Sequence, residues 1–474
     1  MRIVIRIFSI FLLFQISATF ASVRPEIAAG SFYPKNSEDL KSYIVKVLHH
    51  SPVEYHDAYV RAIIVPHAGY AYSGKLAAQA FKQLQGLNPK RIIIIGPAHF
   101  VDVGENVVLP NANYWRTPLG EVAIDQQLRD DLLQEGNYII SDDQPHVPEH
   151  AVEVELPFLQ VLFPEVPILP IAINSIDRAQ EFGALLSKYV DRQTLLIIST
   201  DMSHYYPALT ADAMDGRAIK DIVHQDIEKM VFDLKEHTIE MCGAAAVTTL
   251  LALVKQQGGM EVENFGHNHS GQMTGDPSRV VGYFSGGVYR PKSYQALLDY
   301  GYEVLKYYLE TGRRDAAQLK ERNQLFDSVR GLFVTLRLKP TFGQKEGALR
   351  GCLGHVSTSD PLKESVRLLT IASASEDSRF NPVTIDELPN IEIGLSILTH
   401  PKIIDSYQDI QLGRQGVIVS QGQKSGIFLP EVAELFKSKD DFLAELCTEK
   451  AHLNSDCYKD PATKIKVFET ITFR

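Results

Sequence analysis

The sequence is poor in basic charge and in cysteine, and it has no long apolar run beyond its first residues. It carries 47 Lys and Arg against 58 Asp and Glu, which gives a formal net charge of -11. Because nucleic-acid-binding proteins need basic side chains to neutralise phosphates, this balance argues against a nucleic-acid partner. Four cysteines in 474 residues are too few for a disulfide scaffold. If two of them pair, the neighbours Cys447 and Cys457 are the expected pair, and two reduced thiols are the alternative.

Residues 1–21 have the layout of a signal peptide. Two arginines come first, the apolar run Ile7–Phe14 follows, and small residues then extend to Ala21. The run is too short to span a bilayer as a stable helix. Cleavage after it would also remove it, so we expect no stable membrane span in the mature protein. The pattern therefore predicts export to the periplasm or the extracellular space. The alternatives are an uncleaved anchor, or a misassigned start and a cytoplasmic protein.

The rest of the chain has the size and composition of two folded domains. Apolar residues make up 45% and charged residues 22%, as in soluble globular proteins, and one hydrophobic core rarely exceeds about 250 to 300 residues. Short apolar runs alternate with amphipathic stretches, which predicts an α/β domain with a mostly parallel central sheet and helices on both faces. We expect one long helix over residues 211–234, a loop at 267–269 and a last strand ending near 289. A compact α+β domain is expected to follow.

Two of the predicted strands end in histidines. The run Ile63–Val65 leads into His67, and the run Ile92–Ile95 leads into His99. Ligands of open α/β sheets bind beyond the carboxyl ends of the strands, so the two imidazoles can converge there. One such histidine is more often a hydrogen-bonded structural residue. Two in matching contexts make a shared site about as plausible as two separate structural roles.

Three further polar residues can join this crevice. Asp201 and His204 follow the strand at 195–199 and could form a general acid/base pair; in the alternative, Asp201 caps a turn and His204 packs. Cys242 precedes an apolar stretch and is expected in the first turn of a buried helix, where the helix dipole favours a thiolate. The alternative is a small buried hydrophobe. Two neutral imidazoles and a thiolate would hold Fe(II), Cu or Zn and leave open positions, whereas Mg and Ca prefer oxygen ligands.

These segments resemble the Memo family over about residues 24–290. The motifs that carry the resemblance are PHAGY at 66–70, GPxH at 96–99, S-x-D-x-x-H at 199–204, Cys-Gly at 242–243, TPLG at 117–120, Glu149-His150 with Glu153, and TGDPSRVVGY at 274–283. The resemblance implies the fold of class III extradiol dioxygenases of the LigB type. It also implies that His67, His99 and Cys242 are the metal ligands and that Asp201 and His204 lie beside them.

The likeness to those dioxygenases is incomplete at the third ligand. The dioxygenases use two histidines and one carboxylate, whereas the matching residue here is Cys242. A thiolate donates more charge to iron, can itself oxidise and also suits copper. Dioxygenase activity therefore does not follow from the resemblance, and metal binding or another redox role stays open.

Two other patterns point to less favoured sites. The stretch Gly69–Lys75 follows a strand and nearly matches a phosphate-binding P-loop, but Leu76 stands where a magnesium-binding Ser or Thr is needed. His146 and His150 have the spacing of a helical ligand pair, but Pro148 between them argues against a shared helical face.

The second domain has a motif of its own. Leu349-Arg350-Gly351-Cys352-Leu353-Gly354 suits a tight backbone beside a cleft. With the turns at 377–383 and 426–430, it makes residues 295–474 resemble an AMMECR-type domain. Arg350 and Cys352 are the candidate binding or catalytic patch, with ordinary turn chemistry as the alternative. The fusion resembles AmmeMemoRadiSam systems, which implies a radical SAM partner protein. Such a partner needs a reducing cytoplasm, which conflicts with the signal peptide; we retain export.

The leading hypothesis is a metal-dependent redox protein, an oxidoreductase that holds Fe(II) or Cu at His67, His99 and Cys242. Asp201 and His204 would handle protons near O2 or a small-molecule substrate. The second hypothesis is a non-catalytic protein that sequesters metal, or a scaffold whose cleft recognises a peptide or a partner. Sustained O2 consumption with catechol-type substrates separates the two. The P-loop alternative predicts Mg-ATP binding that is sensitive to Lys75→Ala.

Overall fold

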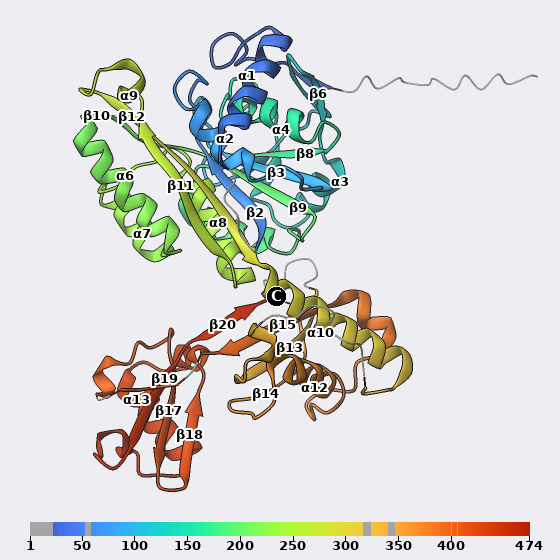
Figure 1. Cartoon of the computed structure of the whole chain (residues 1–474), viewed down its shortest axis with the longest axis vertical. Helices are drawn as coiled ribbons and strands as arrows, with labels where there is room; N and C mark the ends of the chain where they lie inside the picture. Colours follow the sequence, from blue (N-terminus) through green and yellow to red (C-terminus); the bar gives the residue numbers. More distant parts are fainter. Residues whose placement is uncertain (1–21, 53–57, 316–323, 340–346, 400, 405) are drawn as a thin grey trace, which may run out of the picture.

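A computed structural model of the chain describes residues 22–52, 58–315, 324–339, 347–399, 401–404 and 406–474 (Figure 1). The predicted signal peptide at 1–21 lies outside the described residues. Among the helices of the described part, none is long and apolar enough to cross a membrane.

The first half is built around a large mixed sheet in the order β10-β12-β2-β9-β3-β8-β4-β7, with β11 paired to β12. The strands of this half are β1 Val23–Arg24, β2 Ala58–Val65, β3 Arg91–Gly96, β4 Val107–Leu109, β5 Tyr114–Thr117, β6 Gly120–Ala123, β7 Ile139–Ser141, β8 Ile168–Ala172, β9 Thr194–Ser199, β10 Asp201–Tyr206, β11 Glu261–His269 and β12 Val280–Pro291. The four central strands β2, β9, β3 and β8 are parallel, as predicted. Their nearly continuous Ile, Val and Leu runs fit strands that are buried on both faces. Strands β1, β5 and β6 form a separate small sheet.

Helices cover this sheet in two layers. They are α1 Ser37–His50, α2 Gly74–Lys82, α3 Gln126–Leu132, the 3-10 turn η1 Glu153–Glu155, α4 Leu156–Leu162, α5 Ile176–Leu186, α6 Ala208–Val223, α7 Ile227–Lys235, α8 Ala244–Gln257 and α9 Gly271–Thr274. Helix α2 packs on β2 and β12 and contacts α1 and α4. Helix α8 packs on β9 and β3 and is covered by α5. The predicted α/β class is therefore confirmed.

Two local predictions were wrong. The expected long helix at 211–234 is broken into α6 and α7, because Gln225 takes a left-handed φ of 57° and Asp226 caps the second helix. The residues expected in a loop at 267–269 instead form the end of β11, which pairs along β12. There the Nε2 atom of His267 lies 2.8 Å from the Oδ2 atom of the buried Asp215.

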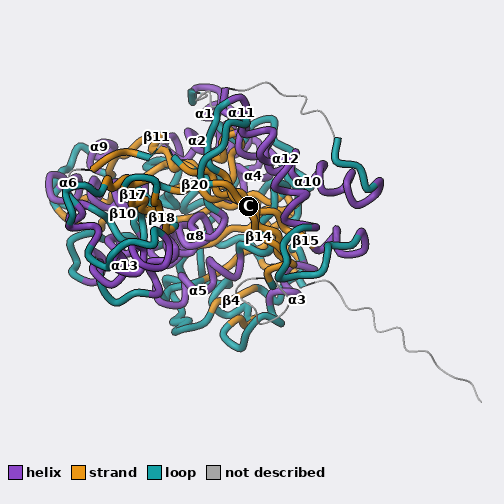
Figure 2. Tube along the Cα trace, turned by 90° about the horizontal axis from the view of Figure 1, so that it is seen from below, coloured by secondary structure: helices purple, strands orange, loops and turns teal. Residues whose placement is uncertain are grey.

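The second half has two antiparallel sheets, β14-β13-β15-β20 and β16-β19-β17-β18, each with its own apolar core. Its elements are α10 Lys292–Thr311, α11 Gln324–Asp327, β13 Leu332–Leu338, β14 Leu349–His355, α12 Leu362–Ser375, η2 Ile385–Asn390, β15 Ile391–Leu398, β16 Lys402–Ile404, η3 Tyr407–Asp409, β17 Gly416–Gln421, β18 Lys424–Phe428, η4 Pro430–Leu435, α13 Lys439–Glu445, η5 Leu446–Lys450, η6 Cys457–Lys459, β19 Lys464–Phe468 and β20 Thr470–Phe473. Seen from below, α10 and α12 lie side by side, away from α13 (Figure 2). The predicted α+β class is confirmed.

The apolar core beside the sheet β16-β19-β17-β18 contains a disulfide between Cys447 and Cys457, the pair expected from the sequence. Both cysteines are buried, and Cys242 and Cys352 are free.

The two halves meet where β12 runs directly into α10. Arg290, at the end of β12, donates to the carbonyl oxygens of Arg474 and Gly258 at 2.9 and 3.3 Å. Gly258 also forms a β-bridge with Phe473. The last strand of the second half is therefore tied to the first half by backbone contacts as well as by side chains.

Candidate metal centre

Three imidazoles converge beyond the carboxyl ends of the parallel strands. His67 follows β2, His99 follows β3, and His150 lies in the loop before η1. One ring nitrogen from each lies within 4.8 Å of the others, close enough for the three to hold one metal ion. The ring centroids are 5.1 to 5.4 Å apart. The structure thus brings His67 and His99 together as predicted and adds His150, which sequence reasoning missed.

His67 is fixed through its Nδ1 atom, so that Nε2, which faces the sulfur of Cys242, keeps the lone pair that can bind a cation. The side chain is buried, and Nδ1 lies 2.7 Å from the hydroxyl of Ser199. The one proton of that hydroxyl is directed at the Ala151 carbonyl oxygen at 2.8 Å or at Oε1 of Glu155 at 3.0 Å, and not at His67. The serine oxygen therefore accepts from Nδ1, which leaves the lone pair on Nε2. Burial and the nearby His150 and His99 rings hold the pKa of His67 well below its usual range, so the imidazole is neutral.

A buried glutamate orients His99. Glu149 accepts the backbone N–H of His99 at 2.5 Å through Oε2, and its Oε1 atom lies 3.0 Å from Nδ1 of the same residue. Burial alone would raise the pKa of Glu149, but the hydrogen bond and charge of His99 outweigh it, and the pKa is lowered. A carboxylate on Nδ1 leaves Nε2 of His99 as the ligand atom and strengthens it as a donor.

His150 shares this glutamate and stacks between two rings. Its Nδ1 atom lies 3.3 Å from Oε1 of Glu149. Its ring centroid is 4.3 Å from that of Phe32 and 5.1 Å from that of His99. Burial is the main cause of its lowered pKa, which favours a neutral ring. Glu149 directly precedes His150 in the sequence. A histidine next to a carboxylate that can orient it was the signal that could have identified His150 as a candidate ligand.

Cys242 lies against His67 but outside the cluster of imidazole nitrogens. Its Sγ atom is 3.3 Å from Nε2 of His67 and accepts the backbone N–H of Asp201 at 3.1 Å. The residue comes just before α8, whose N-cap is Gly243, and not in its first turn as expected. Burial, followed by the charge of Asp201, raises the pKa of the thiol, which disfavours the thiolate that the sequence argument expected at a helix start.

Asp201 and His204 occupy different environments at this edge. Asp201 is buried, its Oδ1 atom accepts the backbone N–H of His67 at 3.0 Å, and burial raises the pKa of its carboxyl to about 7. His204 is partly exposed, and its Nδ1 atom lies 3.3 Å from Oε1 of Glu240. Asp201 therefore supports the backbone of a candidate ligand directly, whereas His204 is held by a second carboxylate.

His146 does not join the centre. It is buried, and its Nε2 atom lies 3.2 Å from the Val108 carbonyl oxygen. Burial, with the charge of Arg24, lowers its pKa to about 4. The sequence argued that His146 and His150 do not share a helical face, and in the structure the two residues have separate contacts.

The loop that carries Glu149 and His150 is held by Arg24, which no sequence motif had indicated. Its guanidinium donates to the carbonyl oxygens of His146 and Glu149 at 2.7 and 2.6 Å, and it pairs with Glu153 at 2.6 Å. Both side chains of the ion pair are buried. The strand β1 thus stabilises the loop on which one candidate ligand and its orienting carboxylate lie.

Comparison with known proteins identifies the family to which the first half of the chain is similar. Residues 24–287 match the Memo-like protein family. The chain belongs to the Memo family. It is 32% identical over 270 residues to a MEMO1 family protein of Nitrosopumilus maritimus, covering 55% of this chain and 98% of that protein. It is 35% identical over 265 residues to one of Aquifex aeolicus, covering 55% and 97%.

The second half matches the AMMECR1 family over residues 298–473. The crystal structure of an uncharacterized protein from Pyrococcus horikoshii is similar, with 33% identity, a TM-score of 0.32, and coverage of 37% of this chain and 88% of that chain. We refer to the two matched regions as the Memo half and the AMMECR1 half.

The candidate patch of the AMMECR1 half lies on β14. Arg350 donates from Nε and Nη2 to the carboxylate of Glu387 at 2.6 and 3.0 Å. The backbone N–H of Cys352 donates to Asp377 at 2.8 Å, and Arg379 donates to the Cys352 carbonyl oxygen at 3.1 Å. Arg350 is thus tied to Glu387 of η2, and the backbone of Cys352 is tied to Asp377, just after α12.

The Arg350–Glu387 pair predicts an acid-sensitive contribution to stability. The hydrogen bond from Arg350 lowers the pKa of Glu387 from 4.5 to about 2. Because the folded-state pKa is the lower one, the contribution is present above about pH 4.5 and is lost as the pH falls toward 2. Glu387→Gln should therefore flatten the pH dependence of the unfolding free energy across this window, measured by denaturant titration. The exposed Glu303→Gln on α10 is the control. An unchanged pH dependence in Glu387→Gln would contradict the assignment.

Proposed function

We propose that the Memo half is a metal-binding redox protein that takes Fe(II) or Cu, with Zn as the remaining candidate. The observation that carries the proposal is the convergence of His67, His99 and His150, with the sulfur of Cys242 touching His67. Neutral nitrogens and a sulfur are the donors that iron, copper and zinc accept, whereas magnesium and calcium prefer oxygen.

The residues present fit such an ion. His67 and His99 would each offer Nε2, because Ser199 and Glu149 occupy their Nδ1 atoms. The third ligand would be Cys242, as the family resemblance implies, or His150. Among the described residues, no positively charged side chain lies against the Cys242 thiol to stabilise a thiolate. The positive charge of a metal ion bound here would supply that stabilisation and favour loss of the thiol proton.

The surrounding side chains support chemistry at an open position. A bound Fe(II) or Cu would supply one-electron chemistry and Lewis acidity. Asp201 fixes the backbone of His67, and His204 with Glu240 would hold a proton beside a bound small molecule. The proposed oxidoreductase activity with O2 and a small substrate rests on this set of groups.

A non-catalytic binding role is the second candidate, and the rim of the site supports it. Phe100 next to His99 is 62% exposed, and Tyr205 next to His204 is 63% exposed. Tyr205 also has a left-handed φ of 65°, which is unusual for a side chain of this size. Exposed aromatic side chains suit recognition of a peptide or another ligand.

Metal content and turnover together test the two candidates. The full chain would be purified without added metal and analysed for Fe, Cu and Zn, beside a His67→Ala/Cys242→Ser double variant and an exposed His50→Ala control. Near-stoichiometric Fe or Cu that is lost only in the double variant, with sustained O2 consumption on catechol-type substrates, is the expected result. The same metal without turnover would favour sequestration or partner binding. No metal, or metal retained by the double variant, would reject the metal site.

We also propose that the protein is exported, which the Cys447–Cys457 disulfide supports, because such bonds persist in oxidising compartments. The fusion of Memo and AMMECR1 halves supports a radical SAM partner, which would instead require the cytoplasm. Cell fractionation with N-terminal sequencing of the recovered protein separates these two proposals.

A further inference from the structure

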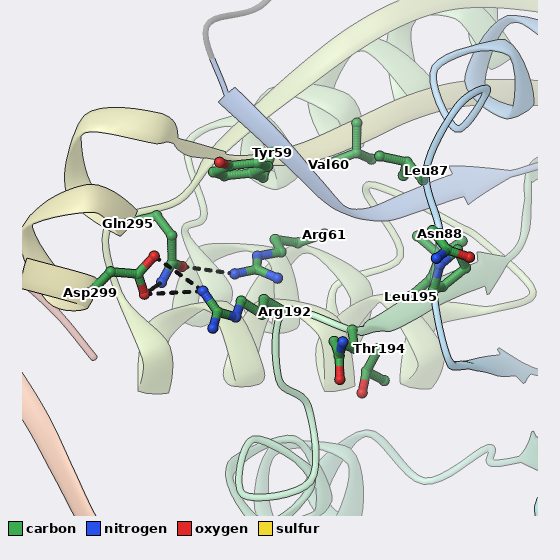
Figure 3. A pocket seen from close by; sticks show the side chains of 12 residues that line it. Tyr59, Val60, Arg61, Leu87, Asn88, Arg192, Thr194, Leu195, Gln295 and Asp299 are labelled. Atoms are coloured by element: carbon green, nitrogen blue, oxygen red, sulfur yellow. Dashed lines mark hydrogen bonds and ion pairs between the residues drawn. The ribbon is translucent and has the colours of Figure 1, made fainter. Parts of the chain in front are cut away.

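A cavity lies at the opposite ends of the strands that carry the metal centre. It is about 170 Å³ in volume and is lined by the start of β2, the start of β9, the loop before β3 and the first turns of α10 (Figure 3). Tyr59, Arg61 and Thr194 come from the Memo half, and Gln295 and Asp299 come from α10. Because His67 follows the far end of β2, this cavity is distinct from the metal centre.

Arg61 is a buried cation in the wall of this cavity. The residue is only 7% exposed. Its two terminal nitrogens donate to neutral oxygens, the Asp191 carbonyl at 3.5 Å and the Gln295 amide at 2.9 Å. Its Nε atom is buried and has no hydrogen-bond partner among the residues that the structure describes. Burial lowers the pKa of this guanidinium; the negative charges of Asp191 and Asp299 offset part of that effect, and the positive charge of Arg192 adds to it.

The acidic groups nearby are already engaged. Asp299 accepts from Arg192 at 3.1 Å and from the Gln295 amide nitrogen at 3.0 Å. The Asp191 carboxylate accepts from the Gln193 backbone N–H and the Thr194 hydroxyl, each at 2.9 Å. No carboxylate of a described residue forms an ion pair with Arg61. A buried arginine without a bonded anion is costly, which makes this wall a place where an anion is favoured.

The rest of the cavity is apolar on one side. Tyr59, Leu87 and Pro89 line it together with Leu195. Tyr59 is 43% exposed, and the Nζ atom of Lys292 lies 5.9 Å from its ring centroid, so part of the ring faces the cavity (Figure 3). The N-terminal turns of the 20-residue helix α10 add a partial positive charge on the polar side.

We propose that this cavity binds a small organic carboxylate, with the carboxylate on Arg61 and the apolar body along Tyr59 and Leu87. A guanidinium matches a carboxylate in geometry as well as charge. The apolar side formed by Tyr59, Leu87, Pro89 and Leu195 can take the body of such a ligand. Because the lining comes from β2 of the Memo half and from α10, which leads into the AMMECR1 half, the ligand would contact residues on both sides of the junction.

Calorimetric titration of the full chain with benzoate tests this site, with benzamide and acetate as matched probes. Benzamide keeps the ring and removes the charge, and acetate keeps the charge and removes the ring. We expect one benzoate per chain and clearly weaker binding of both other probes. Arg61→Met should weaken benzoate binding about ten- to a hundredfold, the range for a hydrogen bond to a charged group.

A second variant covers the case in which Arg61→Met fails to fold. Gln295→Glu keeps the shape of the side chain and its contact with Arg61, but it places a carboxylate where the ligand's would lie. It should also weaken benzoate binding, whereas Arg116→Met, at an exposed pair away from the cavity, should not. Equal binding of benzoate and benzamide, unchanged affinity in both cavity variants, or no binding of benzoate would overturn the proposal.

Discussion

Replacing Arg24 with methionine should lower the free energy of unfolding by about 3 to 5 kcal/mol, the range for breaking one partner out of a buried ion pair. Glu153 is fully buried and would lose the guanidinium that pairs with it. It would retain the Tyr33 hydroxyl at 2.5 Å and the backbone N–H of Ala28 at 2.9 Å, which satisfy hydrogen bonds but not charge. The carbonyl oxygens of His146 and Glu149 would also lose their donor.

Denaturant unfolding of Arg24→Met, Arg24→Met/Glu153→Gln and Arg116→Met measures this effect. The double variant should recover part of the loss, because a neutral amide replaces the unpaired carboxylate. Arg116 forms an exposed pair with Glu121, so its loss should cost no more than about 1 kcal/mol. A loss of less than about 1 kcal/mol in Arg24→Met would show that the ion pair does not hold the loop.

The centre of the Memo half was predictable because its strands are buried on both faces. The runs Ile63–Val65 and Ile92–Ile95 contain only Ile and Val, a pattern typical of strands that are buried on both faces. Parallel strands end at one edge of the sheet, so the positions of the two histidines made a shared site as plausible as two separate structural roles, and the structure brings them together.

The two errors in secondary structure arose at segments whose conformation depends on contacts with residues far away in the sequence. Polar residues at 267–269 look like a loop, yet they form a strand because β12, which follows them, pairs with them throughout. The amphipathic period continues across the end of α6, so it could not reveal that Gln225 turns the backbone. Both cases depend on tertiary packing that propensity does not encode.

The site was predicted in part for a similar reason. Strand ends placed His67 and His99, but His150 sits in a loop whose course depends on Arg24, a residue more than a hundred positions earlier. The expected thiolate at Cys242 was argued from a helix start, whereas burial and the charge of Asp201 dominate its environment. Desolvation depends on the whole surroundings of a group and is not visible in sequence spacing.

Single substitutions should identify the third metal ligand. His67→Ala should weaken Cu or Fe(II) binding by more than the roughly 10- to 100-fold that altering an orienting partner such as Glu149→Gln brings. His67 belongs to both possible ligand sets, since its Nε2 atom faces the Cys242 sulfur and the residue shares the imidazole cluster.

We expect Cys242→Ser to match the loss of metal in His67→Ala and His150→Ala to lose less, because a thiolate brings a full negative charge to the ion and an imidazole brings none. Equilibrium competition with a metal chelator measures the affinities, and the copper-loaded forms add a test by absorption, since only a sulfur ligand gives a sulfur-to-copper band. If His150→Ala is as severe as His67→Ala while Cys242→Ser keeps both affinity and spectrum, three imidazoles hold the metal and the thiol only contacts His67.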